Sequence, residues 1–276
     1  MTGFDHLLVA LNVSAGPFSV LAFSAGLSTS LDAESEPFAL YVLSGSGRLS
    51  APGQAALALD QDAFVLAPGG LRCRLDPSPG FKVAYGSVAG SFGGAAGPFD
   101  GLRGPMATSF AGRPMREAFL ALMSELASPG FGSRALANCI VKQALVTLMR
   151  DAFTSGGQAA LPWIAALRDD RLGRAVAAMI ERPSDPLTLD VLARIAGMSR
   201  STFSERFSAA LGRPPIDFLR EIRLDRAARM LASTDLPVKR IANAVGYESR
   251  SYFSRAFRSR FDIDPSDYRA SRAGCC

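Results

Sequence analysis

The chain has 276 residues, of which 48% are hydrophobic and 20% charged, so it is an ordinary globular composition with a length that suggests about two domains. No run of about 18 apolar residues occurs, which argues against a membrane span. The start, MTGFDHLL, lacks the basic and apolar segments of a secretory signal. These features predict a cytoplasmic protein.

Metal-ligating and catalytic residue types are scarce. The four cysteines are Cys73, Cys139, Cys275 and Cys276, and the only histidine is His6. Their spacing matches no zinc site, and a cytosolic chain keeps scattered cysteines reduced. We therefore expect no metal, no cofactor and no catalytic site.

Charge is distributed unevenly. Residues 165–276 hold 20 Lys and Arg against 14 Asp and Glu, whereas residues 1–164 hold 10 against 11. A basic part joined to a neutral part suggests a module that binds a polyanion and a separate second module. A solvated basic face explains the charge equally well.

The N-terminal part is rich in predicted strands. Short apolar or alternating runs are separated by turns such as Ser44–Gly47 and Pro68–Gly70, a pattern that predicts a small barrel or a sandwich. The runs cover residues 38–43, 47–50, 55–59, 63–67 and 81–85. Residues 86–112 are rich in Gly, Ala, Ser and Pro, and we expect a flexible connection there.

Two amphipathic helices are predicted next, and 128–133 separates them. Their apolar side chains recur every three or four residues, so the pair could cover the barrel or form a dimer interface. These side chains are Met115, Phe119, Leu122 and Leu126 in the first helix and Val141, Leu145, Leu148, Met149 and Ala152 in the second. Residues 154–164 are predicted to be an interdomain linker.

An internal repeat dominates the C-terminal part. Leu192–Gly197 matches Ile241–Gly246, and Arg200–Phe207 matches Arg250–Phe257 about 50 residues later. Each copy has a short helix with small residues, a glycine stop and a second helix, which is the pattern of a helix-turn-helix. A plain helical bundle explains the phenylalanines and glycines, but not the short and basic residues on the outer face of each second helix. That outer face suits the major groove of DNA.

A long helix, Pro215 to about Ser233, is predicted between the copies. Arg220, Arg223, Arg226 and Arg229 recur at every third position. We expect most of this row to be a solvated face, with one or two members touching phosphate.

From Leu172 to Arg269 the sequence resembles the AraC/XylS family of bacterial transcription regulators. The most specific segments are Val238–Arg258, Phe261–Pro265 and Tyr268-Arg269. The resemblance implies an all-α domain over residues 165–272, with seven helices and two helix-turn-helix motifs.

The resemblance also implies DNA-contacting residues in both motifs. Arg255 is the strongest candidate for a base contact, because a bidentate Arg–guanine pair contributes about 1–3 kcal/mol of discrimination. Glu205 is an unusual residue at its position in the family. Its carboxylate either accepts a hydrogen bond from cytosine N4 or is held in a salt bridge. The residues expected at bases or beside them are Arg200, Ser201, Thr202, Ser204, Glu205, Arg206, Arg250, Ser251, Tyr252, Ser254 and Arg255, and those expected at phosphates are Lys239, Arg240 and Arg258.

More weakly, Tyr41–Gly47 and Leu59–Gly70 resemble strands of cupin-type sensor domains. The histidines and glutamate of metal-binding cupins are missing, so an isomerase or oxygenase barrel is disfavoured. The expected fold is an α+β two-domain chain: a cupin-like β-barrel over 1–112, a helical pair over 113–153, the linker and the helical DNA-binding domain.

We expect the protein to be a transcriptional regulator, and specifically an activator, that binds double-stranded promoter DNA and contacts RNA polymerase. A small-molecule effector would bind the barrel, and residues 115–152 would form a homodimer. One alternative is a redox sensor using Cys73, which lies between Arg72 and Arg74, although strand alternation places its thiol opposite both. The Cys275-Cys276 tail carries no assigned role, and another alternative is a constitutive regulator with an empty barrel.

Overall fold

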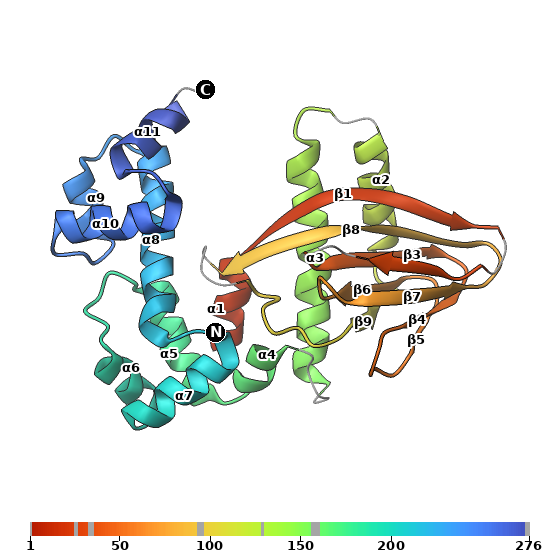
Figure 1. Ribbon diagram of the computed structural model, residues 1–276, viewed down its shortest axis with the longest axis horizontal. Coiled ribbons are helices and arrows are strands. Elements are labelled where there is room, and N and C mark those ends of the chain that lie inside the picture. Colours follow the sequence, from red (N-terminus) through yellow and green to blue (C-terminus); the bar gives the residue numbers. More distant parts are fainter. Residues whose placement is uncertain are drawn as a thin grey trace. The chain divides into compact units, whose positions relative to one another are not determined.

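The computed structural model describes residues 2–24, 27–32, 36–92, 97–127, 130–155 and 161–273. The chain forms two compact units, whose elements are labelled in Figure 1. The helical unit comprises Met1–Leu11, Ser91–Pro98 and Ala166–Cys276, and the sheet unit comprises Asn12–Gly90 and Phe99–Ala165. The first eleven residues thus belong with the C-terminal helices, a grouping that the sequence patterns do not predict.

The sheet unit is built on two antiparallel sheets. The five-stranded sheet has the order β1-β8-β3-β6-β9, and the four-stranded sheet has the order β2-β7-β4-β5. The strands are β1 Leu11–Phe23, β2 Thr29–Asp32, β3 Phe38–Ser44, β4 Gly47–Ser50, β5 Leu57–Leu59, β6 Ala63–Ala67, β7 Arg72–Pro77, β8 Phe81–Phe92 and β9 Met106–Ser109. The five predicted runs are confirmed as β3, β4, β5, β6 and the start of β8.

The two sheets share one hydrophobic core. Leu40 and Val65 of the five-stranded sheet and Cys73 and Leu75 of the four-stranded sheet belong to the same buried cluster. Apolar faces of two sheets packed in this way make a sandwich. The strands that the structure describes form two open sheets, so the closed barrel expected from the sequence is not observed.

The prediction of a flexible connection over 86–112 is wrong for 86–92 and 106–109, which are strands. Strand β8 continues to Phe92, and β9 occupies Met106–Ser109, while residues 93–96 lie outside the described part of the chain. Gly86 of β8 allows close packing here, because a Cβ on it would lie 2.5 Å from Phe18 Cδ2 and from the Pro17 carbonyl oxygen of β1. A glycine in a strand often marks such a close approach.

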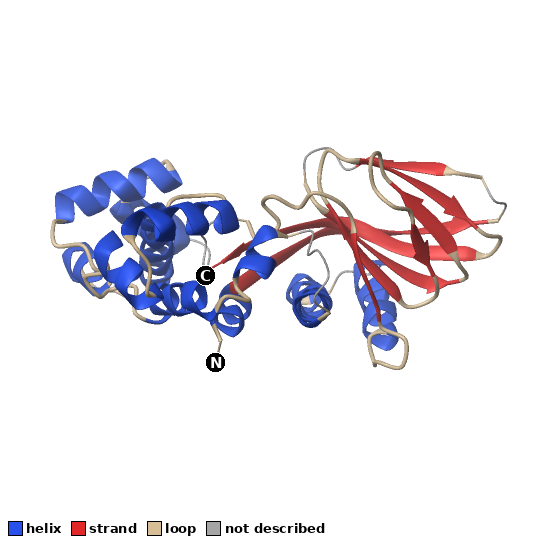
Figure 2. Ribbon diagram, turned by 90° about the horizontal axis from the view of Figure 1, so that it is seen from below, coloured by secondary structure: helices blue, strands red, loops and turns tan. Residues whose placement is uncertain are grey.

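Helices α2 (Arg116–Ala127) and α3 (Ser133–Thr154) lie on one face of the five-stranded sheet (Figure 2). The Phe119 ring stacks on Tyr41 of β3 at 4.2 Å and 8°, and Phe64 of β6 lies 5.9 Å from Phe119. Val141 and Leu145 of α3 are fully buried. The predicted apolar stripes therefore belong to the core of this unit, although the side chain of Leu126 lies outside the described residues.

The helical unit holds the C-terminal helices. Residues 156–160 of the predicted linker lie outside the described residues, and the linker ends in the short helix α4 (Pro162–Ala166) of the sheet unit. The helices that follow are α5 Asp170–Glu181, α6 Leu189–Ala196, α7 Arg200–Leu211, α8 Pro215–Ser233, α9 Val238–Ala244, α10 Arg250–Phe261 and α11 Pro265–Ala273. The unit also contains α1 (Gly3–Ala10), so its helix count differs from the expected seven.

Helix α1 packs closely against α5. A Cβ on Gly3 would lie 2.3 Å from Gly173 Cα, so the two backbones are in contact. His6 Nε2 lies 3.1 Å from Glu181 Oε1, and the apolar side chains Phe4 and Leu7 are buried. The N-terminal helix is thus an integral part of the helical unit.

Candidate nucleic-acid interface

The first helix-turn-helix comprises α6 and α7. Gly197 ends α6 in the left-handed conformation with φ +62°, and the Ser199 hydroxyl caps α7 by accepting from the Thr202 backbone N–H at 3.2 Å. Phe203 and Phe207 are fully buried, and Phe207 contacts Phe218 of α8 at 5.5 Å. The buried rings hold α7 in place and leave its opposite face exposed.

The second motif, α9 and α10, repeats this construction. The Ser249 hydroxyl accepts from the Tyr252 backbone N–H at 3.3 Å, and Phe253 and Phe257 are fully buried with their rings 5.7 Å apart. Gly246 has φ +88°, which disfavours any residue with a Cβ. The repeat in the sequence is therefore a repeat of cap, turn and buried aromatic pair.

The predicted residues of α7 are exposed or half-buried at the surface. Arg200 pairs with Asp190 at 3.1 Å, and Arg206 with Asp169 at 3.3 Å. The pKa of the Asp169 carboxyl is lowered, chiefly by hydrogen bonds from the Arg171 side chain. Hydroxyls of Ser201 and Thr202 lie near the Ser199 cap, and Ser204 is half-buried.

Glu205 is exposed and has no hydrogen bond or ion pair with any residue that the structure describes. The salt-bridge alternative for this carboxylate therefore has no partner within the described ranges, and a base contact remains the alternative to consider.

On α10 the predicted residues differ in their pairing. Arg250, Ser251 and Arg255 are exposed, and in the described part of the chain neither arginine has an ion pair. Arg258 pairs with Asp264, whose carboxylate accepts from Arg258 Nε at 3.0 Å and raises the pKa of that guanidinium.

The other predicted residues of the second motif also lie at the surface. Tyr252 is 49% exposed and Ser254 is half-buried. Lys239 and Arg240 are exposed in the first turn of α9.

The arginine row of α8 is not a single solvated face. Arg223 is half-buried and donates to the carbonyl oxygens of Pro183 at 2.6 Å and Asp185 at 2.8 Å. Burial lowers its pKa. A Cβ on Gly246 would lie 3.1 Å from the Arg223 guanidinium and 2.9 Å from the Ser184 carbonyl oxygen, so this arginine holds the loop before α6 against the turn of the second motif. Sequence spacing places these arginines on one helix but does not show that Arg223 turns inward.

Metal sites and membrane-spanning helices are absent from the residues that the structure describes. Across the ranges that the structure describes, no group of three or more His, Cys, Asp and Glu side chains could hold a metal ion. In the same ranges no helix has the length and hydropathy to cross a membrane. Cys73 is fully buried between exposed Arg72 and Arg74, as strand alternation predicts, and Cys139 of α3 is exposed.

Comparison with known proteins gives a match in the same region. A family model for a helix-turn-helix domain matches residues 192–271. The chain is 32% identical over 163 residues to an AraC-like transcription regulator of Streptomyces antibioticus, covering 58% of this chain and 54% of that protein. It is 40% identical over 106 residues to the RCS-specific HTH-type transcriptional activator RclR of Escherichia coli, covering 38% and 37%.

Among solved structures, the DNA-binding domain of the global transcriptional factor AdpA, determined in complex with a target DNA, is 33% identical to this chain. The match covers 38% of this chain and 96% of the AdpA domain, with a TM-score of 0.37. The chain spans about half, or less, of the length of the two regulators it matches. The chain thus carries a helix-turn-helix domain in residues 192–271 and is similar over that region to AraC-like transcriptional regulators.

Proposed function

We propose that the protein is a sequence-specific DNA-binding transcriptional regulator of the AraC type. The observation that carries the proposal is the duplicated motif, in which α7 and α10 each have a serine cap, a buried aromatic face and an exposed short or basic face. Helices of this build enter the major groove with the N-terminal residues at base edges. The relatives are named as transcription regulators, which supports a non-enzymatic role.

The residues divide by the contact they are proposed to make. Arg255 and Arg250, which are exposed and unpaired in the described residues, are available for bidentate contact with guanine. Lys239 and Arg240 are proposed at phosphates, where they raise affinity without sequence preference. Arg206 and Arg258 already pair with carboxylates, so DNA would compete with Asp169 and Asp264 for them.

The sheet unit is proposed as the sensor and dimerisation part. A small organic effector bound there would modulate DNA binding, and α2 and α3 would contribute the homodimer contact. Activation through RNA polymerase at promoter DNA is proposed because one relative is named as a transcriptional activator. A regulator that needs no effector remains the second possibility for this unit.

The redox alternative is not favoured. The Cys73 thiol has 0% exposure within the sheet core, so an oxidant cannot reach it without opening that core. A Cys73→Ser variant with an unchanged response to oxidant is the expected result.

The test is selection of sequences from random duplex DNA by the full chain at physiological salt. Selection of an asymmetric motif of about two helical turns is expected, because one chain presents two reading helices. Arg255→Ala is expected to relax one position of the motif by about 1–3 kcal/mol. Arg48→Ala, at an exposed position of β4 in the sheet unit, is the control. Binding that is weak and equal on all sequences for the wild-type protein would overturn the proposal.

A further inference from the structure

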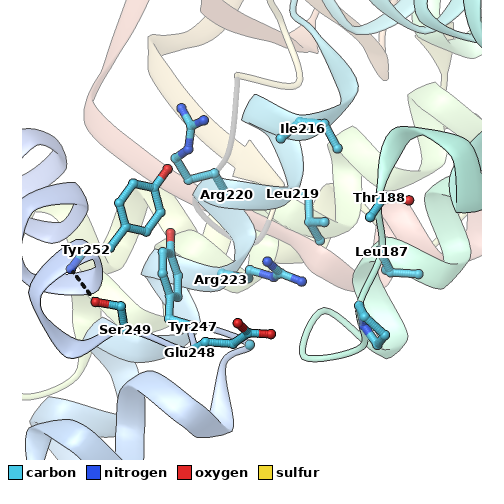
Figure 3. Close-up of a pocket in the computed structure, with 12 residues that line it drawn as sticks. Leu187, Thr188, Ile216, Leu219, Arg220, Arg223, Tyr247, Glu248, Ser249 and Tyr252 are labelled. Carbon is cyan, nitrogen blue, oxygen red and sulfur yellow. Dashed lines mark hydrogen bonds between the residues drawn. The ribbon is translucent and has the colours of Figure 1, made fainter.

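A groove of about 450 Å³ lies within the helical unit between the two helix-turn-helix motifs (Figure 3). Three segments line it: 186–188 before and at the cap of α6, one face of α8 from Ile216 to Arg223, and 246–252 at the turn and start of α10. The predicted DNA-contacting residues include one groove residue, Tyr252. The groove therefore brings together residues that the repeat alone does not assign.

The electrostatics of the groove favour an anion. Thr188 caps α6 and Ser249 caps α10, so the positive ends of two helices lie at its wall. Two arginines, Arg220 and Arg223, line the same groove against one carboxylate, Glu248. Arg220 also pairs with Asp217 at 2.8 Å, but both side chains are 43% exposed, and such a surface pair exchanges easily.

Tyr247 provides an independent observation that points to a ligand. Its side chain is only 6% exposed, and its hydroxyl has no hydrogen-bond partner among the residues that the structure describes. Figure 3 shows the hydroxyls of Tyr247 and Tyr252 directed toward the side where Arg220 lies. Burial raises the pKa of Tyr247 to about 12, while the charges of Arg220 and Arg223 oppose the rise. The hydroxyl is thus a neutral donor at neutral pH.

An unpaired buried hydroxyl destabilises the free protein, because it has lost its hydrogen bonds to water without gaining another. A ligand oxygen that accepts from Tyr247 removes that penalty. The Tyr252 ring lies 5.8 Å from Tyr247 and is half-exposed, so its movement can open the path to the hydroxyl.

We propose that the groove binds a phosphate group of the DNA backbone between the two base-reading segments, with Arg220 and Tyr247 as donors. This inference rests on the proposed function. DNA is the favoured source of the phosphate because the groove lies at the N-terminus of α10, the end of a reading helix that enters the major groove. The contact would add affinity and register but no sequence preference.

The test measures binding of the full chain to its selected duplex and to an unrelated duplex of equal length, over a series of salt concentrations. Tyr247→Phe is expected to weaken binding to both duplexes about tenfold and to leave the salt slope unchanged, because a neutral donor is lost. Arg220→Ala is expected to weaken both and to reduce the salt slope by about 1. Glu248→Gln is expected to strengthen both. Arg48→Ala, at an exposed position of β4 in the sheet unit, is the matched control.

Thermal unfolding of the free protein separates this role from a structural one. Tyr247→Phe removes a hydroxyl without a partner, so the free variant is expected to be as stable as the wild-type protein or more stable. A loss of stability without loss of DNA affinity would overturn the proposal.

Two further outcomes are distinguishable. If the Tyr247 and Arg220 variants bind both duplexes like the wild type while Arg255→Ala still changes base preference, the phosphate site is overturned and the regulator function stands. If the wild-type protein selects no sequence, thermal unfolding in inorganic phosphate tests the anion site by itself. A rise in Tm over chloride at equal ionic strength that disappears in Tyr247→Phe would support an anion site filled by free phosphate. No rise would overturn the site as well.

Discussion

Pairing within the protein separates arginines that look alike in the sequence. Arg223 and Arg226 both lie on α8, yet one donates to two backbone carbonyls and the other is exposed. On α10, Arg255 is exposed and unpaired in the described residues, whereas Arg258 is held by Asp264. An arginine that is already paired gives up that interaction when it contacts DNA, so its net contribution is smaller.

Glu205 allows a test of base reading at a single carboxylate. If it accepts from cytosine N4, Glu205→Ala is expected to relax one position of the selected motif by about 1–3 kcal/mol. If it only faces phosphates, the same variant is expected to strengthen binding to every sequence. Sequence selection with Glu205→Ala, and with Glu117→Ala at an exposed position of α2 as the control, separates the two.

Asp225 makes the stability of the helical unit depend on pH. Burial raises its pKa from 3.8 to about 6, and Arg260 at 4.0 Å only partly opposes this. The folded state therefore binds a proton more tightly than the unfolded chain, and the stability from this group is present below about pH 4 and is lost as the pH rises to about 6. The loss is up to about 3 kcal/mol.

Asp225→Asn is accordingly expected to raise the unfolding free energy at pH 7 and to flatten its change between pH 4 and 6. Denaturant unfolding at several pH values measures this. Asp235→Asn, at an exposed position beyond α8, serves as the control. An Asn variant that is no more stable than the wild type at pH 7 contradicts the assignment.

At the scale of elements, two glycines that both have a positive φ have different surroundings. Gly212 has φ +70°, and no described residue other than its chain neighbours lies within 4 Å of where its Cβ would be. Gly246 has φ +88°, and its Cβ would lie 2.9 Å from the Ser184 carbonyl oxygen. Gly212→Ala is expected to cost about 1–2 kcal/mol for the left-handed conformation alone. Gly246→Ala is expected to cost more and to weaken DNA binding, because the loop before α6 and Arg223 must shift. Equal losses for the two variants in chemical unfolding would show that the contact is unimportant.

The elements were predictable where the pattern was local. The repeat of small residue, glycine, serine and paired phenylalanines predicts both motifs, and the helix from Pro215 to Ser233 has the predicted bounds. Strand β8 was cut short in prediction because Gly86 and its small neighbours look flexible until β1 is placed beside them. The groove was missed because its walls come from three segments that no sequence period relates.

At the scale of the whole molecule, the exposed apolar side chains bear on assembly. The inner stripes of α2 and α3 are buried in the sheet unit, while Leu120, Leu136 and Phe131 remain exposed on these helices and their connection. Leu136→Asp is therefore expected to turn a dimer into a monomer in sedimentation velocity. Leu236→Asp, exposed in the helical unit, is the control. A wild-type monomer, or a Leu136→Asp dimer, would remove α3 from the proposed contact.

The packing of α1 on α5 has a consequence for the order in which the protein is made. Helix α1 leaves the ribosome before the sheet unit and α5, with Phe4, Leu7 and Leu8 on a face whose partner is still to be synthesised. At about 5–20 residues per second, α5 follows roughly ten to thirty seconds later. The sheet unit can fold during that interval, since all its segments precede α5 in the chain. The helical unit is completed only when α1 packs on α5, so residues that are translated before the sheet unit are among the last to reach their native place.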